Sequence, residues 1–78
     1  MKVERIKGTR DWMDVYLEDG RVARMFGELL ITGFVAFTKS LLKWKNPEGE
    51  PISEEEKKQL IEAINENQKV SKVKITLE

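Results

Sequence analysis

Apolar and polar residues alternate in the first third of the chain in a way that predicts a β-hairpin. The pair Asp19-Gly20 suits a two-residue type I′ turn, which needs positive φ at both positions. Pairing outward from this turn sets Val15 opposite Arg24 and Met13 opposite Phe26. Residues that pair across two strands share a face of the sheet. In this register the predicted core face carries Met13, Val15, Leu17, Val22 and Phe26, and the other face carries Trp12, Asp14, Tyr16, Ala23, Met25 and Gly27.

Strand-forming residues continue beyond the hairpin and predict a third strand over Phe34–Thr38. A short fourth strand is expected near Leu41–Trp44. Residues 45–51 contain two prolines and a glycine, which predicts a loop. Residues 1–10 are charged, with few apolar anchors, and predict either an edge strand or a partly ordered arm.

One amphipathic helix is predicted after the loop, from near Ser53 to near Gln68. Ser53 and Glu56 have the spacing of a capping box, in which each side chain accepts a hydrogen bond from a free backbone amide of the first turn. The apolar stripe of this helix consists of Leu60, Ile61 and Ile64, with Ala63 beside them.

The last segment alternates again and predicts a half-buried closing strand. Its inward residues are Val73, Ile75 and Leu77, and its outward residues are Lys72, Lys74 and Thr76. The pattern indicates an α+β fold, a small antiparallel sheet in the order β-β-β-(β)-α-β with the helix on one face. Residues 11–78 are expected to form a single α+β domain. The expected core packs Leu60, Ile61 and Ile64 against Val15, Leu17, Val22, Phe37 and Ile75.

Charge excludes some classes of partner. Fourteen basic residues balance fourteen acidic ones, and the basic residues are scattered along the sequence, which argues against nucleic acid. The segment from Glu48 to Glu66 contains seven glutamates but only two basic residues, Lys57 and Lys58, so it has a net negative charge. No apolar run approaches the roughly 20 residues of a membrane span, and the first residues do not form a signal peptide. Without cysteine, a reducing, cytoplasmic location is expected.

Candidate chemistry is sparse. The chain has no histidine and no cysteine, the commonest base, nucleophile and transition-metal ligands. Glycines are isolated, so no phosphate-binding loop is predicted. The glutamates near the predicted helix start lack the spacing of a calcium loop. An enzyme would have to use the sheet carboxylates Asp14 and Glu28. We therefore expect a protein that is not an enzyme and has no metal or cofactor.

Two groups of residues are candidates for contact with a partner protein. Trp12 and Tyr16, with Met25 across from them, form an apolar patch if their face is solvated, and the N-terminal arm or a second copy of the chain covers them if it is not. The acidic candidates are Glu48, Glu50, Glu54 and Glu55. Trp44 is expected to close the core below the helix start.

Ordered motifs in the middle of the chain resemble a known family. The run contains Gly27-Glu28-Leu29-Leu30, Phe34-Val35-Ala36-Phe37, Lys39-Ser40, Trp44-Lys45-Asn46-Pro47 and Glu50-Pro51-Ile52-Ser53-Glu54-Glu55-Glu56-Lys57. This order and spacing is similar to that of the immunity protein 74 family, over roughly Trp12 to Glu78. Fewer prolines follow Trp44 here than is usual in that family.

The resemblance implies a small protein of a bacterial polymorphic toxin system that binds and neutralises a cognate toxin encoded nearby. It carries no catalytic residue to this chain. An acidic epitope would steer association with a basic toxin surface, as on many nucleases. The alternative from another class is a self-associating structural module, with the Trp12/Tyr16 face as a homodimer seam.

Overall fold

The computed structural model describes residues 1–68 and 74–78. Its strands are β1 (Val3–Gly8), β2 (Trp12–Leu17), β3 (Val22–Leu30), β4 (Gly33–Ala36), β5 (Trp44–Asn46) and β6 (Ile75–Leu77), its helix is α1 (Glu54–Asn67), and a short 3-10 turn spans Thr38–Ser40. Within this described part, no helix has the length and apolar character needed to cross a membrane.

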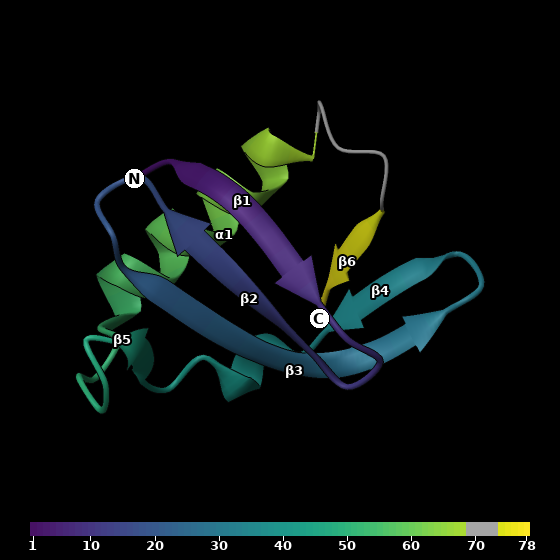
Figure 1. Cartoon of the computed structure of the whole chain (residues 1–78), viewed down its shortest axis with the longest axis horizontal. Coiled ribbons are helices and arrows are strands. Elements are labelled where there is room, and N and C mark those ends of the chain that lie inside the picture. The colour runs from purple at the N-terminus through teal and green to yellow at the C-terminus, as the bar shows by residue number, and fades with distance from the viewer. Residues whose placement is uncertain (69–73) are drawn as a thin grey trace.

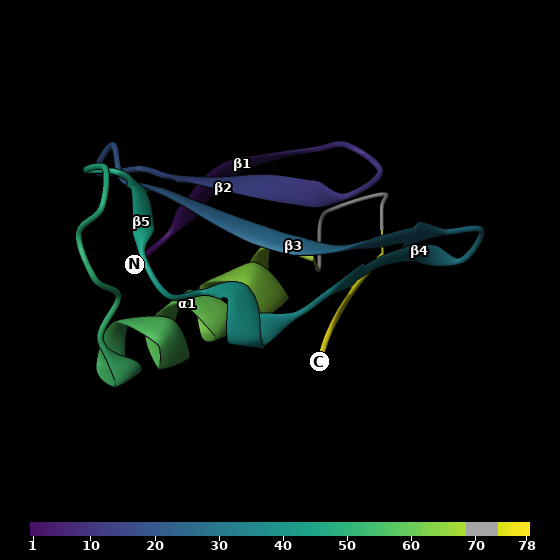
Figure 2. The ribbon, with the colours of Figure 1, turned by 90° about the horizontal axis from the view of Figure 1, so that it is seen from below.

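The strands form one curled sheet in the order β1-β2-β3-β4-β6, with α1 against one face (Figures 1 and 2). The first residues of β3 pair with β2 on one edge and with β5 on the other, while the end of β3 pairs with β4. All pairings among the named strands are antiparallel except that of β4 with β6. The predicted α+β fold class is confirmed.

The predicted hairpin exists, but its register was wrong by one residue. Val15 pairs with Ala23, and Asp14 pairs with Arg24. Gly20 has a φ of 94°, whereas no residue other than glycine has a positive φ in the described part of the chain. Asp19 therefore does not adopt the type I′ conformation, and a three-residue loop closes between Leu17 and Arg21, whose amide and carbonyl are hydrogen-bonded at 2.9 Å.

This shift exchanges the two faces of β3, because side chains alternate along a strand. Ala23 and Met25 are buried in the core beside Met13, whereas Val22 is half-buried and Phe26 is 51% exposed. The predicted core position of Val22 and Phe26 is thus wrong, as is the placement of Met25 on the other face. On β2 the prediction holds, since Met13, Val15 and Leu17 are all buried.

The helix begins where the sequence predicts. Ser53 accepts a hydrogen bond from the amide of Glu56, and Glu56 accepts one from the amide of Ser53, so the capping box is confirmed. Leu60 and Ile64 are fully buried and Ala63 lies beside them, whereas Ile61 is only half-buried. The side of α1 that packs on the sheet therefore includes Leu60, Ala63 and Ile64, and it is rotated away from Ile61 relative to the prediction.

The strands after the hairpin differ in their limits from the predicted ones. β3 continues to Leu30, β4 ends at Ala36, and β5 starts at Trp44. Ser40 ends the β3–β4 pairing, because its hydroxyl accepts from the amide of Phe26 at 2.9 Å and donates to the carbonyl of Phe37 at 2.6 Å. Phe37, predicted in the core, is 43% exposed at this turn.

The closing strand β6 spans Ile75–Leu77, whereas the alternating pattern in the sequence runs from Lys72 to Leu77. Ile75 is buried and Leu77 packs partly against the core, as predicted. Lys72 and Val73 lie outside the described residues. Trp44 is 2% exposed within the same core cluster as Leu60 and Ile64, which agrees with its expected place.

Candidate interaction surface

The sheet face opposite α1, called here the outer face, carries a layer of aromatic rings and cations. Trp12 and Tyr16 point to this face from β2, and each ring lies under a guanidinium. The carbon atom Cζ of Arg24 is 3.7 Å from the centroid of Trp12, and that of Arg5 is 4.4 Å from the centroid of Tyr16. Such stacks are cation–π interactions. Both rings are half-buried. Of the alternatives left open by the sequence, the N-terminal segment covers part of this face through Arg5, and Arg24 of β3 covers Trp12.

At the centre of this layer is a carboxylate that is nearly inaccessible. Asp14 is 3% exposed and accepts two hydrogen bonds from Arg24, at 2.7 and 3.0 Å, and one from the Nζ atom of Lys45 at 2.9 Å. Burial alone would raise the pKa of Asp14, but the hydrogen bonds and positive charges of Arg24 and Lys45 outweigh it and hold this pKa below its ordinary value. Asp14 is therefore a structural anion that fixes two cations, which argues against a catalytic role.

The register predicted for β2 and β3 differs from the observed one by one residue, and for this reason the sequence pattern did not place the members of this cluster together. With Asp14 opposite Arg24, an acid and a base face each other directly across two strands. Lys7 also pairs with Asp14, from β1. Lys7, Arg24 and Lys45, which are far apart in the sequence, thus lie on one face of the sheet, which the sequence pattern did not predict.

A second ion-pair cluster joins the hairpin turn to the start of α1. Arg21 contacts Asp19 at 2.8 Å and Glu56 at 3.1 Å, and its guanidinium stacks on Trp44 at 4.7 Å. The hydrogen bonds from Arg21 lower the pKa of Asp19, and that from the amide of Ser53 lowers the pKa of Glu56. Glu56 is therefore engaged within the fold and is not offered to a partner.

The four acidic candidates occupy the loop before α1 and its first turn. Glu48, Glu50, Glu54 and Glu55 are all exposed, and we call them the acidic end. None of the four forms an ion pair within residues 1–68 and 74–78. Gln59 donates a weak hydrogen bond to Glu55 at 3.4 Å. Among the described residues, no group of acidic side chains has the arrangement needed to hold a metal ion.

A groove connects the acidic end to the outer face. It has a volume of about 660 Å³ and lies between β3 and residues 40–48. Its lining includes Arg24, Phe26, Leu42, Lys43, Lys45 and Glu48. Because Lys45 also lies 5.8 Å from the ring of Trp12, the groove brings the two predicted groups of contact residues to neighbouring positions.

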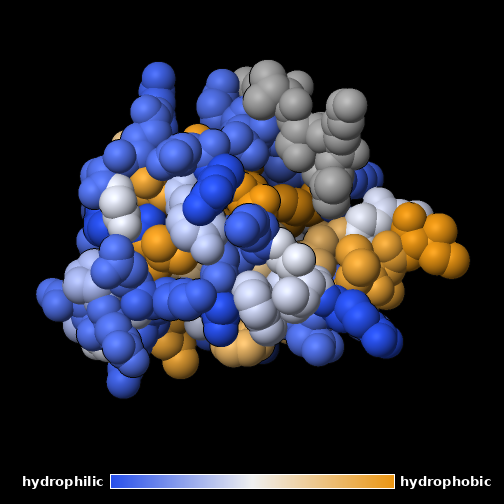
Figure 3. Space-filling view, viewed as in Figure 1, coloured by the Kyte–Doolittle hydropathy of each residue, from blue (hydrophilic) through white to orange (hydrophobic). Residues whose placement is uncertain are grey.

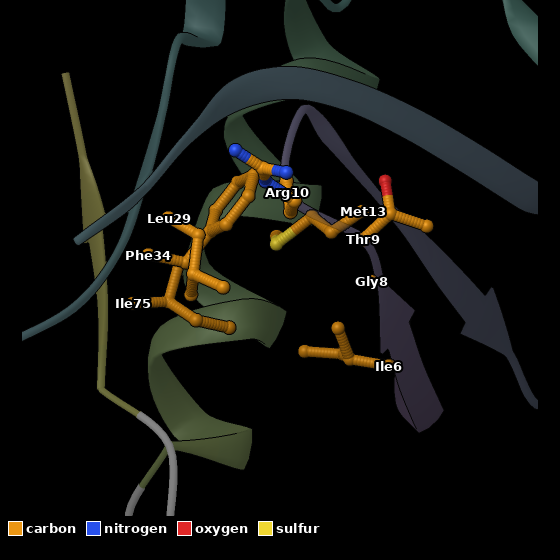
Figure 4. A pocket seen from close by; sticks show the side chains of 8 residues that line it. All are labelled: Ile6, Gly8, Thr9, Arg10, Met13, Leu29, Phe34 and Ile75. Carbon is orange, nitrogen blue, oxygen red and sulfur yellow. The ribbon is translucent and has the colours of Figure 1, made fainter. Parts of the chain in front are cut away.

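A third exposed feature is the projecting β3–β4 hairpin. Leu29, Leu30 and Ile31 are large apolar residues that remain exposed on it, and Figure 3 shows apolar surface gathered at this end of the molecule. Behind it lies an apolar pocket of about 390 Å³, in which Ile6 points across toward Leu29 and Ile75 (Figure 4). Edge strands β1 and β6 both contribute to this pocket because the sheet is curled.

A comparison with known protein families gives a match to this chain. The model of the family named Immunity protein 74 matches residues 5–78, which covers nearly the whole chain. No curated protein and no solved structure matches the chain. The match covers the helix and all the named strands except the first two residues of β1. The chain belongs to the Immunity protein 74 family.

Proposed function

We propose that this protein binds and neutralises a cognate bacterial toxin in the cytoplasm, without catalytic turnover. The observation that carries the proposal is the family match over residues 5–78, since the family is one of immunity proteins. The described residues add a physical argument. Their most buried acid, Asp14, is held by two cations, and their acidic groups have no metal-binding arrangement. These features support a role in binding over a role in catalysis.

The acidic end is the part of the epitope that we assign to a basic toxin surface. Its four carboxylates are exposed and lack cationic partners in the described part of the chain, so their field acts outward. Unscreened charge of this kind accelerates encounter with an oppositely charged partner, more so at low salt. Trp12 and Tyr16 contribute beside it, as aromatic anchors stacked under arginine.

Co-expression with the adjacent toxin gene tests the function. We expect the wild-type protein to restore growth and to copurify with the toxin. No restoration of growth and no complex would contradict the proposal. Changing Glu48, Glu50 and Glu54 to lysine should slow association and make it less dependent on salt. The matched control changes the exposed Glu4, Glu18 and Glu62 to lysine, which alters net charge equally at other places.

The homodimer alternative meets an electrostatic obstacle. A two-fold seam places the same patch of both copies in contact. On the Trp12/Tyr16 face, such a seam would bring together two patches that each carry the cations Arg5 and Arg24. We therefore expect sedimentation velocity to show a monomer at low salt. A dimer that Trp12→Glu dissociates would reverse this conclusion.

A further inference from the structure

The groove between β3 and residues 40–48 combines two chemical features, exposed apolar side chains and an excess of positive charge. The first is apolar. Phe26 is 51% exposed and Leu42 is 68% exposed, and both line the groove. Large apolar side chains that remain exposed beside each other in a groove are characteristic of sites that bind another apolar group.

The second feature is an excess of positive charge. Arg24, Lys43 and Lys45 line the groove, against one carboxylate, that of Glu48. Arg24 and Lys45 share the carboxylate of Asp14, whereas Lys43 forms no ion pair within the described residues. Because Asp14 fixes the positions of Arg24 and Lys45, their remaining N–H donors are held in place before a ligand arrives.

From these features we infer that the groove binds a segment of the toxin that carries a carboxylate next to a large apolar side chain. The inference rests on the proposed function and specifies its partner. The apolar side chain packs on Phe26 and Leu42, and the carboxylate accepts hydrogen bonds from Lys43 and its neighbours. Glu48 repels a second carboxylate at the acidic end of the groove, so it sets the direction of the bound segment.

Nucleic acid fits this groove less well. Two of its three cations already share an internal carboxylate, and Glu48 lies in its lining. A phosphate backbone gains its affinity from many unpaired cations.

An NMR titration of the isotopically labelled protein tests the chemistry of the groove. The probes are a short blocked peptide with glutamates flanking leucine and phenylalanine, the same peptide with glutamine for glutamate, and a single-stranded oligonucleotide. We expect the glutamate peptide to shift the amide resonances of Arg24, Phe26 and Leu42–Lys45, and the glutamine peptide to bind at least about tenfold more weakly. Equal binding of both peptides, no binding of either, or binding of the oligonucleotide alone would overturn the inference.

Two variants link the groove to the toxin. Lys43→Glu and Leu42→Asp change exposed side chains and should leave the far-ultraviolet circular dichroism unchanged. Each should weaken the toxin complex by about tenfold or more. The matched controls are Lys58→Glu on the exposed side of α1 and Ile31→Asp on the β3–β4 hairpin, which should bind as the wild type does.

The outcomes separate this inference from the proposed function. A wild-type complex that Lys43→Glu and Leu42→Asp leave intact would overturn the groove as the binding site, while the neutralising function stands. Absence of any complex with wild-type protein would overturn the proposed function, and with it the toxin as the partner of the groove.

Discussion

Asp14 on β2 and Arg24 on β3 lie directly opposite each other, and two N–H groups of Arg24 donate to the two carboxylate oxygens of Asp14. The guanidinium also covers the ring of Trp12. This pair therefore fixes both the register of the hairpin and the chemistry of its outer face. An Asp-Arg pair of this geometry joins two strands through side chains as well as through the backbone.

Replacing Asp14 with asparagine should lower the free energy of unfolding by about 1–3 kcal/mol, because Arg24 and Lys45 lose a charged acceptor. The loss stays below that of a fully buried pair, since 30% of Arg24 and 45% of Lys45 are exposed. Urea denaturation measures it. A double-mutant cycle with Arg24→Met should show coupling, and additive losses would contradict the pairing.

Stability should fall in acid through the same carboxylate. The pKa of Asp14 is lowered in the fold from its ordinary value of 3.8. The unfolded chain therefore binds the proton more readily, and the stabilisation is complete above about pH 5 and is lost as the pH falls below 3.8 toward the folded pKa. Asp19 and Glu56 act in the same direction. Denaturation midpoints measured from pH 7 to pH 3 should decline less steeply for Asp14→Asn than for wild type.

The helix face provides a matched pair of core substitutions. Ile64 is fully buried, and Ile64→Ala should lower the free energy of unfolding by about 2–5 kcal/mol. Ile61 is one of the three helix residues expected in the core, but it is only half-buried. Ile61→Ala should therefore lower that free energy by about 1 kcal/mol or less. Equal losses for the two variants in chemical denaturation would show that the helix packs differently.

The hairpin shows how far the sequence can define this fold. Alternation placed Met13, Val15 and Leu17 on the core side of β2, and it is correct there. For β3 the pattern Val22 to Phe26 contains apolar residues at both parities, so only the turn could decide its register. Asp19-Gly20 is compatible with a two-residue or a three-residue loop, and the sequence does not distinguish them.

The candidate surfaces also differ in how well the sequence predicts them, depending on whether they rest on local signals or on strand register. Glu48, Glu50, Glu54 and Glu55 were placed near the helix start by local signals, the proline loop and the capping box, which do not depend on register. The Asp14 cluster and the groove arise from residues far apart in the sequence, such as Arg24 and Lys45. A one-residue slip in the register of β3 conceals such sites, because it moves Arg24 and Phe26 to the opposite face of the sheet.

Gln68 and Ile75 provide a final test, at the edge of the sheet. The side-chain amide of Gln68 donates to the carbonyl of Ile75 at 2.6 Å and accepts from its amide at 2.9 Å. On the other side of β6, Lys74 and Glu78 bond to β4. Gln68 thus occupies the position that a further strand would take, and it blocks a backbone edge that could pair with another chain.

Gln68→Ala should free both groups of Ile75 and lower the free energy of unfolding by about 1–2 kcal/mol. It should also raise the rate of aggregation on mild heating, since an open edge strand recruits other strands. The matched control is Gln59→Ala on the exposed side of α1, where the side chain makes one long hydrogen bond to Glu55. Urea denaturation and light scattering measure the two effects. If Gln68→Ala behaves as Gln59→Ala does in both, the glutamine does not protect the edge, and β6 must be shielded by its shortness alone.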